Sequence, residues 1–336
     1  MSARIRWQPG RLKYTAAIPL LVTLAIPLGL LAQKPTKPPQ TQLELVVLGS
    51  GGPRSFGRAS TSYLILIENR PRILVDAGPG AFLELGKLGL DLAHVDIVLL
   101  THLHIDHSAD IPAIFLDRAL TADQPIRFKV FGPQGEGLFP STKQFLQLLF
   151  GPGGAYEYEK TFGAEETIEA VDLPIALDSP ERNIVSEGDL RVREIATHHG
   201  DCPAVAYRID YKHNSITFSG DMDASAISNL QHLALDSDLL VAHAAVLDPP
   251  GSPEILYTLH TPPKQIGQAA RDARVKHLLL SHIAPVIEEN RRQVLRSIAN
   301  SYKQSIEFAH DGMRIPVTAA KSSPHHEARA GTPSGQ

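Results

Sequence analysis

The sequence predicts an α/β protein with layered architecture, on two observations. From Leu43 onward, short β-branched and apolar runs alternate with helix-type patterns. Hydrophobic residues make up 43% of the chain and charged residues 20%, which is typical of a globular protein and excludes a fibrous or wholly disordered one. Cys202 is the only cysteine, so a disulfide scaffold is excluded as well.

The pattern begins with three short strands and a helix. Strands are predicted over residues 43–48, 62–68 and 72–75, the last two joined by a turn at residues 69–71. Asp76-Ala-Gly-Pro-Gly80 then leads into a helix that ends near Leu88. Residues 96–100 are almost continuously apolar, which predicts a buried central strand, and a further strand is predicted over residues 127–131.

The second half of the pattern has the same character. Strands are predicted over residues 190–196, 204–211, 215–219 and 239–242, with a hairpin turn at Lys212-His-Asn214. Helices over residues 262–274 and 286–302 bracket a strand over residues 277–280. Residues 132–189 hold a helix rich in Phe and Leu (143–150) and an acidic, loop-rich stretch, expected either to overhang the active site or to form a surface excursion. We interpret residues 43–316 as one domain.

The N-terminal segment indicates export. Arg4, Arg6, Arg11 and Lys13 precede a charge-free run of 17 residues, 16–32. This predicts a signal peptide or membrane anchor over residues 1–32 and a Pro-rich linker over residues 33–42, with the globular body on the outer, periplasmic side of the membrane. Residues 317–336 are small and polar, and we expect a disordered tail.

Charge is unevenly distributed along the chain. The first 43 residues hold six basic and no acidic residues, which leaves 26 basic against 36 acidic residues afterwards, a net charge of −10. An acidic body is a poor electrostatic start for binding a polyanion such as RNA.

The segment Thr101-His-Leu-His-Ile-Asp-His107 directly follows the apolar strand. Residues two apart in extended chain project to the same side, so His102 and His104 can face one cation. In a helix they would point roughly 200° apart. Asp106 and His107 come where the chain leaves the strand and can turn toward a neighbouring cation. Nitrogen and hard oxygen ligands of this kind suit a pair of zinc ions.

Further ligands are expected at the ends of other strands. Thr197-His-His-Gly200, Ser219-Gly-Asp221 and Ser281-His282 each end a predicted strand. Asp221 would bridge both cations, while His199 completes the first site and His282 the second. His198 competes with His199 for that position. Because adjacent residues on a strand face opposite ways, only one of the two should bind.

With these residues in this order, the sequence resembles the metallo-β-lactamase fold superfamily, the αββα metallo-hydrolases. It is most similar to the ribonuclease Z and arylsulfatase-like branch, by the motifs Val47-Leu-Gly-Ser-Gly-Gly-Pro53, Val75-Asp-Ala-Gly78, His260-Thr261 and Ala309-His-Asp-Gly-Met313. The resemblance implies a four-layer αββα sandwich and two divalent cations, zinc first and manganese or iron as alternatives. Class B lactamases tend to carry Cys where this chain has Asp221, which disfavours a β-lactam substrate.

The resemblance also implies catalytic roles. Two cations would activate a bridging hydroxide, with Asp106 or Asp221 as acceptor of the water's proton and His260 as donor to the leaving oxygen. Asp76 is expected to accept the N–H of a metal-bound imidazole, or else to be a simple turn residue. His243 is expected to support the ligands or to be structural. For His260 the alternative is an exposed loop residue.

The leading hypothesis is therefore an exported or membrane-tethered hydrolase that cleaves a phosphodiester, sulfate ester or similar small ester, with a homodimer left open. One alternative is a ribonuclease Z type endoribonuclease that processes tRNA 3′ ends. Two departures weaken it: His243-Ala-Ala245 lacks the acid of the family's His-Glu pair, and only 21 residues lie between His199 and Asp221, where many such nucleases carry a tRNA-gripping arm. The other alternative is a metal-binding module without turnover.

Overall fold

The computed structural model describes residues 42–54 and 56–318. The predicted export segment and most of the linker and tail lie outside these residues. Among the described residues no helix is both long and apolar enough to cross a membrane.

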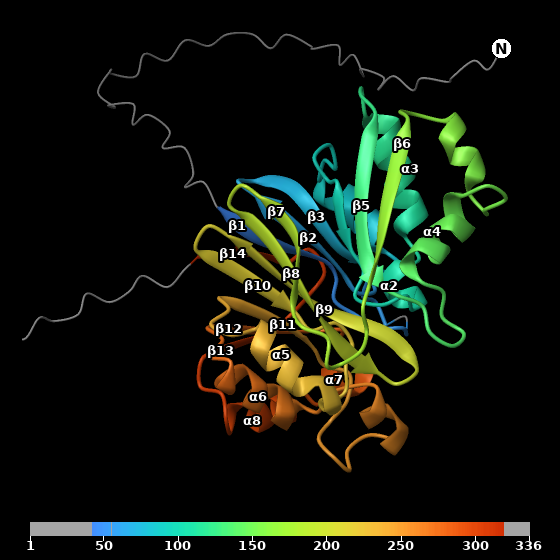
Figure 1. Cartoon of the computed structure of the whole chain (residues 1–336). Helices are drawn as coiled ribbons and strands as arrows, with labels where there is room; N and C mark the ends of the chain where they lie inside the picture. The colour runs from blue at the N-terminus through green and yellow to red at the C-terminus, as the bar shows by residue number, and fades with distance from the viewer. Residues whose placement is uncertain (1–41, 55, 319–336) are drawn as a thin grey trace, which may run out of the picture.

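Two seven-stranded sheets form the centre of the structure (Figure 1). The first contains, in spatial order, β14 (Arg314–Val317), β1 (Leu43–Gly49), β2 (Ser62–Ile67), β3 (Arg70–Ala77), β4 (Ile97–Leu99), β5 (Ile126–Pro133) and β6 (Glu166–Leu173). The second contains β13 (Ser305–Phe308), β12 (His277–Ser281), β11 (Leu239–His243), β10 (Asn214–Phe218), β9 (Cys202–Tyr211), β8 (Leu190–His199) and β7 (Arg182–Glu187). In each sheet one half is antiparallel and the other parallel.

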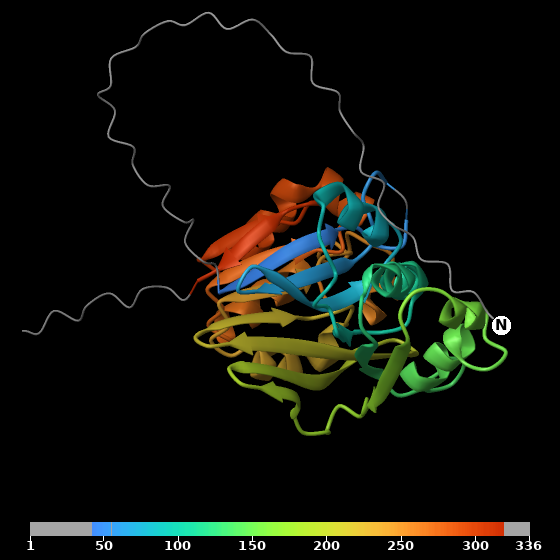
Figure 2. The same ribbon diagram turned by 90° about the horizontal axis from the view of Figure 1, so that it is seen from above.

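Helices cover the outer face of each sheet, as Figures 1 and 2 show. The outer face of the first sheet packs against α1 (Ala81–Leu88), α3 (Ile111–Thr121) and α4 (Thr142–Phe150). That of the second packs against α5 (Ile227–Leu233), α6 (Pro263–Asp272), α7 (Pro285–Glu289) and α8 (Arg291–Ala299). Short turns of helix are α2 (Ile105–Ser108), η1 (Glu157–Thr161), η2 (Ala224–Ala226) and η3 (Glu254–Thr258).

Strand β1 shows why both faces of the sheets are buried. Leu45 and Val47 belong to the core between the sheets, whereas Val46 and Leu48 belong to the core beneath the helices. Successive strand residues point to opposite faces, so an uninterrupted apolar run fits a strand covered on both sides. The predicted αββα sandwich is confirmed.

Several predicted elements need correction. The stretch within residues 132–189 is not mainly loop, because β6 and β7 occupy it and form the edge strands of the two sheets. The single helix expected over residues 286–302 is two helices, α7 and α8, which meet at Asn290. Strands β13 and β14 and helices α3 and α5 were not predicted.

Candidate metal centre

The carboxyl ends of several strands from both sheets meet at one edge of the sandwich. Asp76 ends β3, His102 follows β4, His199 ends β8, and His243 ends β11. The loops after β4, β10 and β12 add the other residues. The structure thereby brings together all seven predicted ligands: His102, His104, Asp106, His107, His199, Asp221 and His282.

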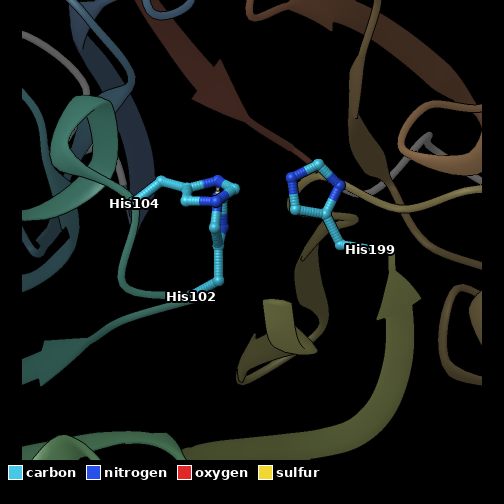
Figure 3. A group of neighbouring side chains, drawn as sticks. All are labelled: His102, His104 and His199. Carbon is cyan, nitrogen blue, oxygen red and sulfur yellow. Dashed lines mark hydrogen bonds between the residues drawn. The ribbon is translucent and has the colours of Figure 1, made fainter. Parts of the chain in front are cut away.

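Three imidazoles form the first ligand group (Figure 3). His102 Nε2 and His104 Nδ1 lie 3.1 Å apart, as expected for a His-x-His pair that projects to one side. His199 faces them from the other sheet, with its ring centroid 4.9 Å from that of His102 and 5.1 Å from that of His104.

Asp106, His107 and His282 form the second group. His282 Nε2 lies 3.2 Å from Asp106 Oδ2, and His107 Nε2 lies 3.6 Å from the same oxygen. All three side chains are buried. Among the described residues, His107 Nε2 has no hydrogen-bond partner. A buried ring nitrogen that faces carboxylates without a hydrogen bond fits a metal ligand.

Asp221 lies between the two groups. Its Oδ2 is 3.9 Å from His102 Nε2 and 3.8 Å from His199 Nε2 on one side. On the other side it is 3.6 Å from His107 Nε2 and 3.1 Å from His282 Nε2. One carboxylate oxygen thus faces both ligand groups, which is the arrangement that a bridging ligand requires.

The structure separates the adjacent residues His198 and His199. The His199 side chain is 2% exposed and belongs to the first group, whereas that of His198 is 45% exposed and its Nδ1 lies 2.8 Å from Asp223 Oδ2. The strand alternation expected from the sequence accounts for the difference.

Asp76 lies behind both groups. Its Oδ2 lies 2.8 Å from His107 Nδ1 and accepts from Thr101 Oγ1, and its Oδ1 accepts from the Thr101 amide. Asp76 and His282 both have φ 54°, a left-handed conformation that is uncommon outside glycine and often found at functional sites. The turn after β3 therefore fixes the orientation of the His107 ring.

Asp76→Asn is expected to weaken metal binding about 10–100-fold, because an amide cannot replace both oxygens as acceptors. Asn tolerates the left-handed φ, so the backbone should be retained. Metal titration of the apo-protein measures the effect. Asp110→Asn is the matched control, since Asp110 Oδ2 accepts from the backbone amides of Gly80 and Phe82 near α1 and contacts no imidazole. Equal affinity loss in both variants would contradict the assigned role.

His243, for which a supporting or a structural role was expected, lies beside a ligand. Its Nδ1 is 2.7 Å from Asp221 Oδ1, and its Nε2 is 3.1 Å from the Tyr63 hydroxyl. Other contacts around the cluster were not predicted. His199 Nδ1 donates to the Leu259 carbonyl at 2.7 Å, and the Phe139 ring lies 5.6 Å from that of His104. Tyr63, Leu259 and Phe139 carry no local sequence signal, since only the fold brings them to the cluster.

The glycine-containing loop that follows β1 passes close to His282, one of the expected metal ligands. A Cβ at Gly52 would lie 2.7 Å from His282 Cε1, so only glycine fits there without a shift. Asp311 fixes this loop by accepting from Ser50 and from the Ala59 amide. The Ala309-His-Asp-Gly-Met313 motif therefore supports the loop that borders His282.

The electrostatics differ between the two groups. Burial lowers the pKa of His102, His104 and His199, so these imidazoles are neutral at neutral pH and offer lone pairs. Burial also opposes the charge of His107 and His282, but nearby carboxylates outweigh it, raising the pKa of His107 well above its usual range and that of His282 to about 9. Metal binding at the second group is therefore coupled to loss of these protons.

His260 borders the cluster rather than lying in an exposed loop. Its ring centroid is 5.3 Å from that of His199 and 5.5 Å from that of His282, and its Nδ1 is buried without a hydrogen-bond partner. Burial lowers its pKa to about 3. One of its ring nitrogens also lies within 4.8 Å of a ligand atom of His199 and of one of Asp221. His260 is therefore either a further metal ligand or a group that faces the substrate.

Comparison with known proteins supports the interpretation of this cluster. Residues 71–283 match the Beta-lactamase superfamily domain. The chain belongs to this superfamily. Its metallo-hydrolase fold implies divalent metal binding, and the donor set described above fits that requirement.

Among curated relatives, a protein named ribonuclease Z from Mycobacterium avium (strain 104) is 25% identical over 288 residues, 82% of this chain and 99% of the relative. The structure of human tRNase Z, short form, covers 82% of this chain and 100% of that chain, with a TM-score of 0.63 and 19% identity. A diphosphatase from the PhnP family covers 81% of this chain and 97% of that chain, with a TM-score of 0.56 and 17% identity. The expected placement in the ribonuclease Z branch is confirmed.

Proposed function

We propose that the protein is a dinuclear metal-dependent hydrolase that cleaves phosphodiester bonds in small esters. The observation that carries this proposal is Asp221 Oδ2 between two groups of imidazole ligands. His102, His104 and His199 would hold one cation, and Asp106, His107 and His282 the other. Two such cations, with zinc as the first candidate, would supply an activated water and offset the charge on the phosphoryl oxygens.

The chain's own residues have separate roles in the reaction. Both oxygens of Asp221 face imidazoles, because Oδ1 lies 2.7 Å from His243 Nδ1. The Asp106 side chain is 10% exposed, against 3% for Asp221, and so is more accessible to water. We therefore assign proton acceptance from the attacking water to Asp106. His260, which is neutral because burial lowers its pKa to about 3, would donate an N–H hydrogen bond to the leaving oxygen and keep its proton, and the leaving group would take its proton from solvent.

The test is turnover by the full-length protein. We expect the zinc-loaded protein to hydrolyse bis(p-nitrophenyl) phosphate. Treatment with a chelator should abolish this activity, and addition of zinc or manganese should restore it. p-Nitrophenyl sulfate tests the arylsulfatase alternative in the same assay. Stoichiometric metal content without turnover of any ester would favour the non-catalytic module.

A ribonuclease Z type activity is the second candidate. It is favoured by the curated relatives, which are named ribonuclease Z and align with 82% of this chain. Against it, the residues between His199 and Asp221 are taken up by β9, β10 and the turns that join them, which leaves no arm there. Cleavage of a precursor tRNA at a rate above that of the aryl phosphodiester would replace our first proposal with this one. Export to the periplasm also remains a proposal, for which fractionation of cells expressing the full chain is the test.

His260→Ala distinguishes the two assignments for this residue. If His260 faces the substrate, kcat is expected to fall about 100-fold while metal content stays unchanged, because a hydrogen-bond donor aimed at the charge that develops on the leaving oxygen contributes roughly 10²–10³-fold. Metal content by mass spectrometry and kcat for the aryl phosphodiester are measured on the same sample. A variant with lower metal content would instead identify His260 as a ligand.

A further inference from the structure

Three large apolar side chains are exposed around the metal cluster. The exposed fraction is 75% for Ile105, 100% for Leu138 and 67% for Ile255, and we call these residues the apolar rim. Single exposed apolar residues are common on proteins, but several in loops that contact one polar cluster indicate a binding surface. Each rim residue comes from a different loop, and each loop contacts a member of the cluster.

Ile105 begins helix α2, directly after His104. The next two residues, Asp106 and His107, are buried in the second ligand group, and this fixes the helical turn. Ile105 is thereby directed outward beside the cluster. Its exposure follows from the ligand geometry and not from an unstructured loop.

Leu138 lies at the tip of a hydrogen-bonded turn. The Glu136 amide donates to the Phe139 carbonyl at 3.2 Å, and the Phe139 amide donates to the Glu136 carbonyl at 2.9 Å. Gly137 supplies the positive φ of 57° that the turn requires. The Phe139 ring packs against His104 at 5.6 Å, so the turn presents Leu138 to solvent at the cluster.

Ile255 lies on η3, none of whose residues is buried. The chain continues from η3 to Leu259, whose carbonyl accepts from His199, and to His260. A Cβ at Gly200 would lie 2.8 Å from Leu259 Cδ2, so this loop also contacts the turn that follows His199. Ile255 therefore lies in a loop that contacts the first ligand group at His199.

The charges beside the rim are acidic. Glu136 neighbours Leu138 in the turn, Glu254 precedes Ile255, and Asp201 follows the His199-Gly200 turn, all three exposed. Carboxylates repel the phosphates of a polyanion, whereas an uncharged group has no such cost. Apolar side chains among carboxylates favour an apolar substituent over an RNA backbone.

We propose that the apolar rim binds an alkyl or aryl substituent of the ester, so that the substrate is a phosphodiester with an apolar group on the side that is not cleaved. This inference rests on the proposed function. Ile105, Leu138 and Ile255 are the specificity-determining residues, and they act by removing apolar surface of the substrate from water.

The test compares p-nitrophenyl phosphodiesters whose second ester group is methyl, butyl or hexyl, so that the leaving group is constant. For the zinc-loaded full-length protein, kcat/KM is expected to rise at least about 10-fold from methyl to hexyl. Ile105→Ser, Leu138→Ser and Ile255→Ser should each reduce this ratio, and the triple variant should bring it to about one. Leu235→Ser is the matched control: Leu235 is 44% exposed, and its carbonyl accepts from Arg208 near the amino end of β11.

A binding measurement separates this inference from the proposed function. Calorimetric titration with methyl-, butyl- and hexylphosphonate should give affinities that rise with chain length in the wild type and in Leu235→Ser, but not in the triple rim variant. Binding that depends on chain length, without turnover of any ester, would overturn the function and retain the rim. Turnover that is independent of chain length, or a dependence that survives in the triple variant, would overturn the rim.

Discussion

Asp221→Asn is expected to reduce bound metal from two ions to one or none per chain and to lower turnover by more than the roughly 10–100-fold that loss of an outer contact costs. The carboxylate is 3% exposed; its Oδ2 lies 3.1 to 3.9 Å from nitrogens of four imidazoles, and its Oδ1 lies 2.7 Å from His243 Nδ1. An asparagine amide has the same shape but no negative charge, and its NH₂ group, which cannot bind a cation, would face the imidazole nitrogens. Metal content and kcat/KM for the aryl phosphodiester measure the two losses.

Asp223→Asn is the matched control for this change. Asp223 lies two residues further on, is also mostly buried, and bonds to His198 and Ser225 instead of the ligand groups. Its variant should keep both ions and near wild-type turnover. Circular dichroism of both apo-proteins checks that each has folded. Full metal content in Asp221→Asn would show that this carboxylate does not bridge the two ions.

The sequence was sufficient to predict the central strands and the metal-ligand candidates that follow them. Runs such as residues 97–100 are buried on both faces, so they are apolar throughout and easily recognised. Polar residues at the ends of such strands were expected to supply the metal ligands, and the order of His102, Asp221 and His282 resembles that of the superfamily. The structure brings these three residues into one cluster.

The edge strands were missed for a physical reason. Strand β6 is acidic and only half-buried along most of its length, and β13 alternates between exposed and half-buried residues. Such strands lack the apolar run that marks a central strand, and their pairing is decided by neighbours distant in sequence. The acidic composition of residues 164–173 therefore resembled a loop.

The residues that contact the metal ligands from other elements could not be predicted from local sequence patterns, because they too are brought there by neighbours distant in sequence. Tyr63 reaches His243 from β2, at 180 positions of sequence separation, and Phe139 reaches His104 from a turn after β5. Asp76 was found because it stands at the end of a strand, directly before the glycine-containing turn that leads to α1. A ligand can be predicted when strand and ligand are adjacent in sequence, and a residue that contacts the ligand from elsewhere requires the fold.

His199→Ala and His198→Ala are expected to have opposite outcomes, although the two residues are adjacent. His199 is one of three imidazoles in the first group, and its ring is held by the Leu259 carbonyl at 2.7 Å. Its removal leaves His102 and His104 with one ligand fewer, so the first site should lose its ion and turnover should fall at least about 100-fold. Metal stoichiometry and turnover of both variants are measured side by side.

His198→Ala removes a half-exposed ring whose partner is Asp223, at the surface of the same strand end. Turnover within about threefold of wild type and a full metal complement are expected, since surface changes away from a site usually have small effects. The pair also tests the strand register itself. A shift of one residue in β8 would exchange the faces of His198 and His199, so metal loss in His198→Ala and not in His199→Ala would contradict both the register and the ligand set.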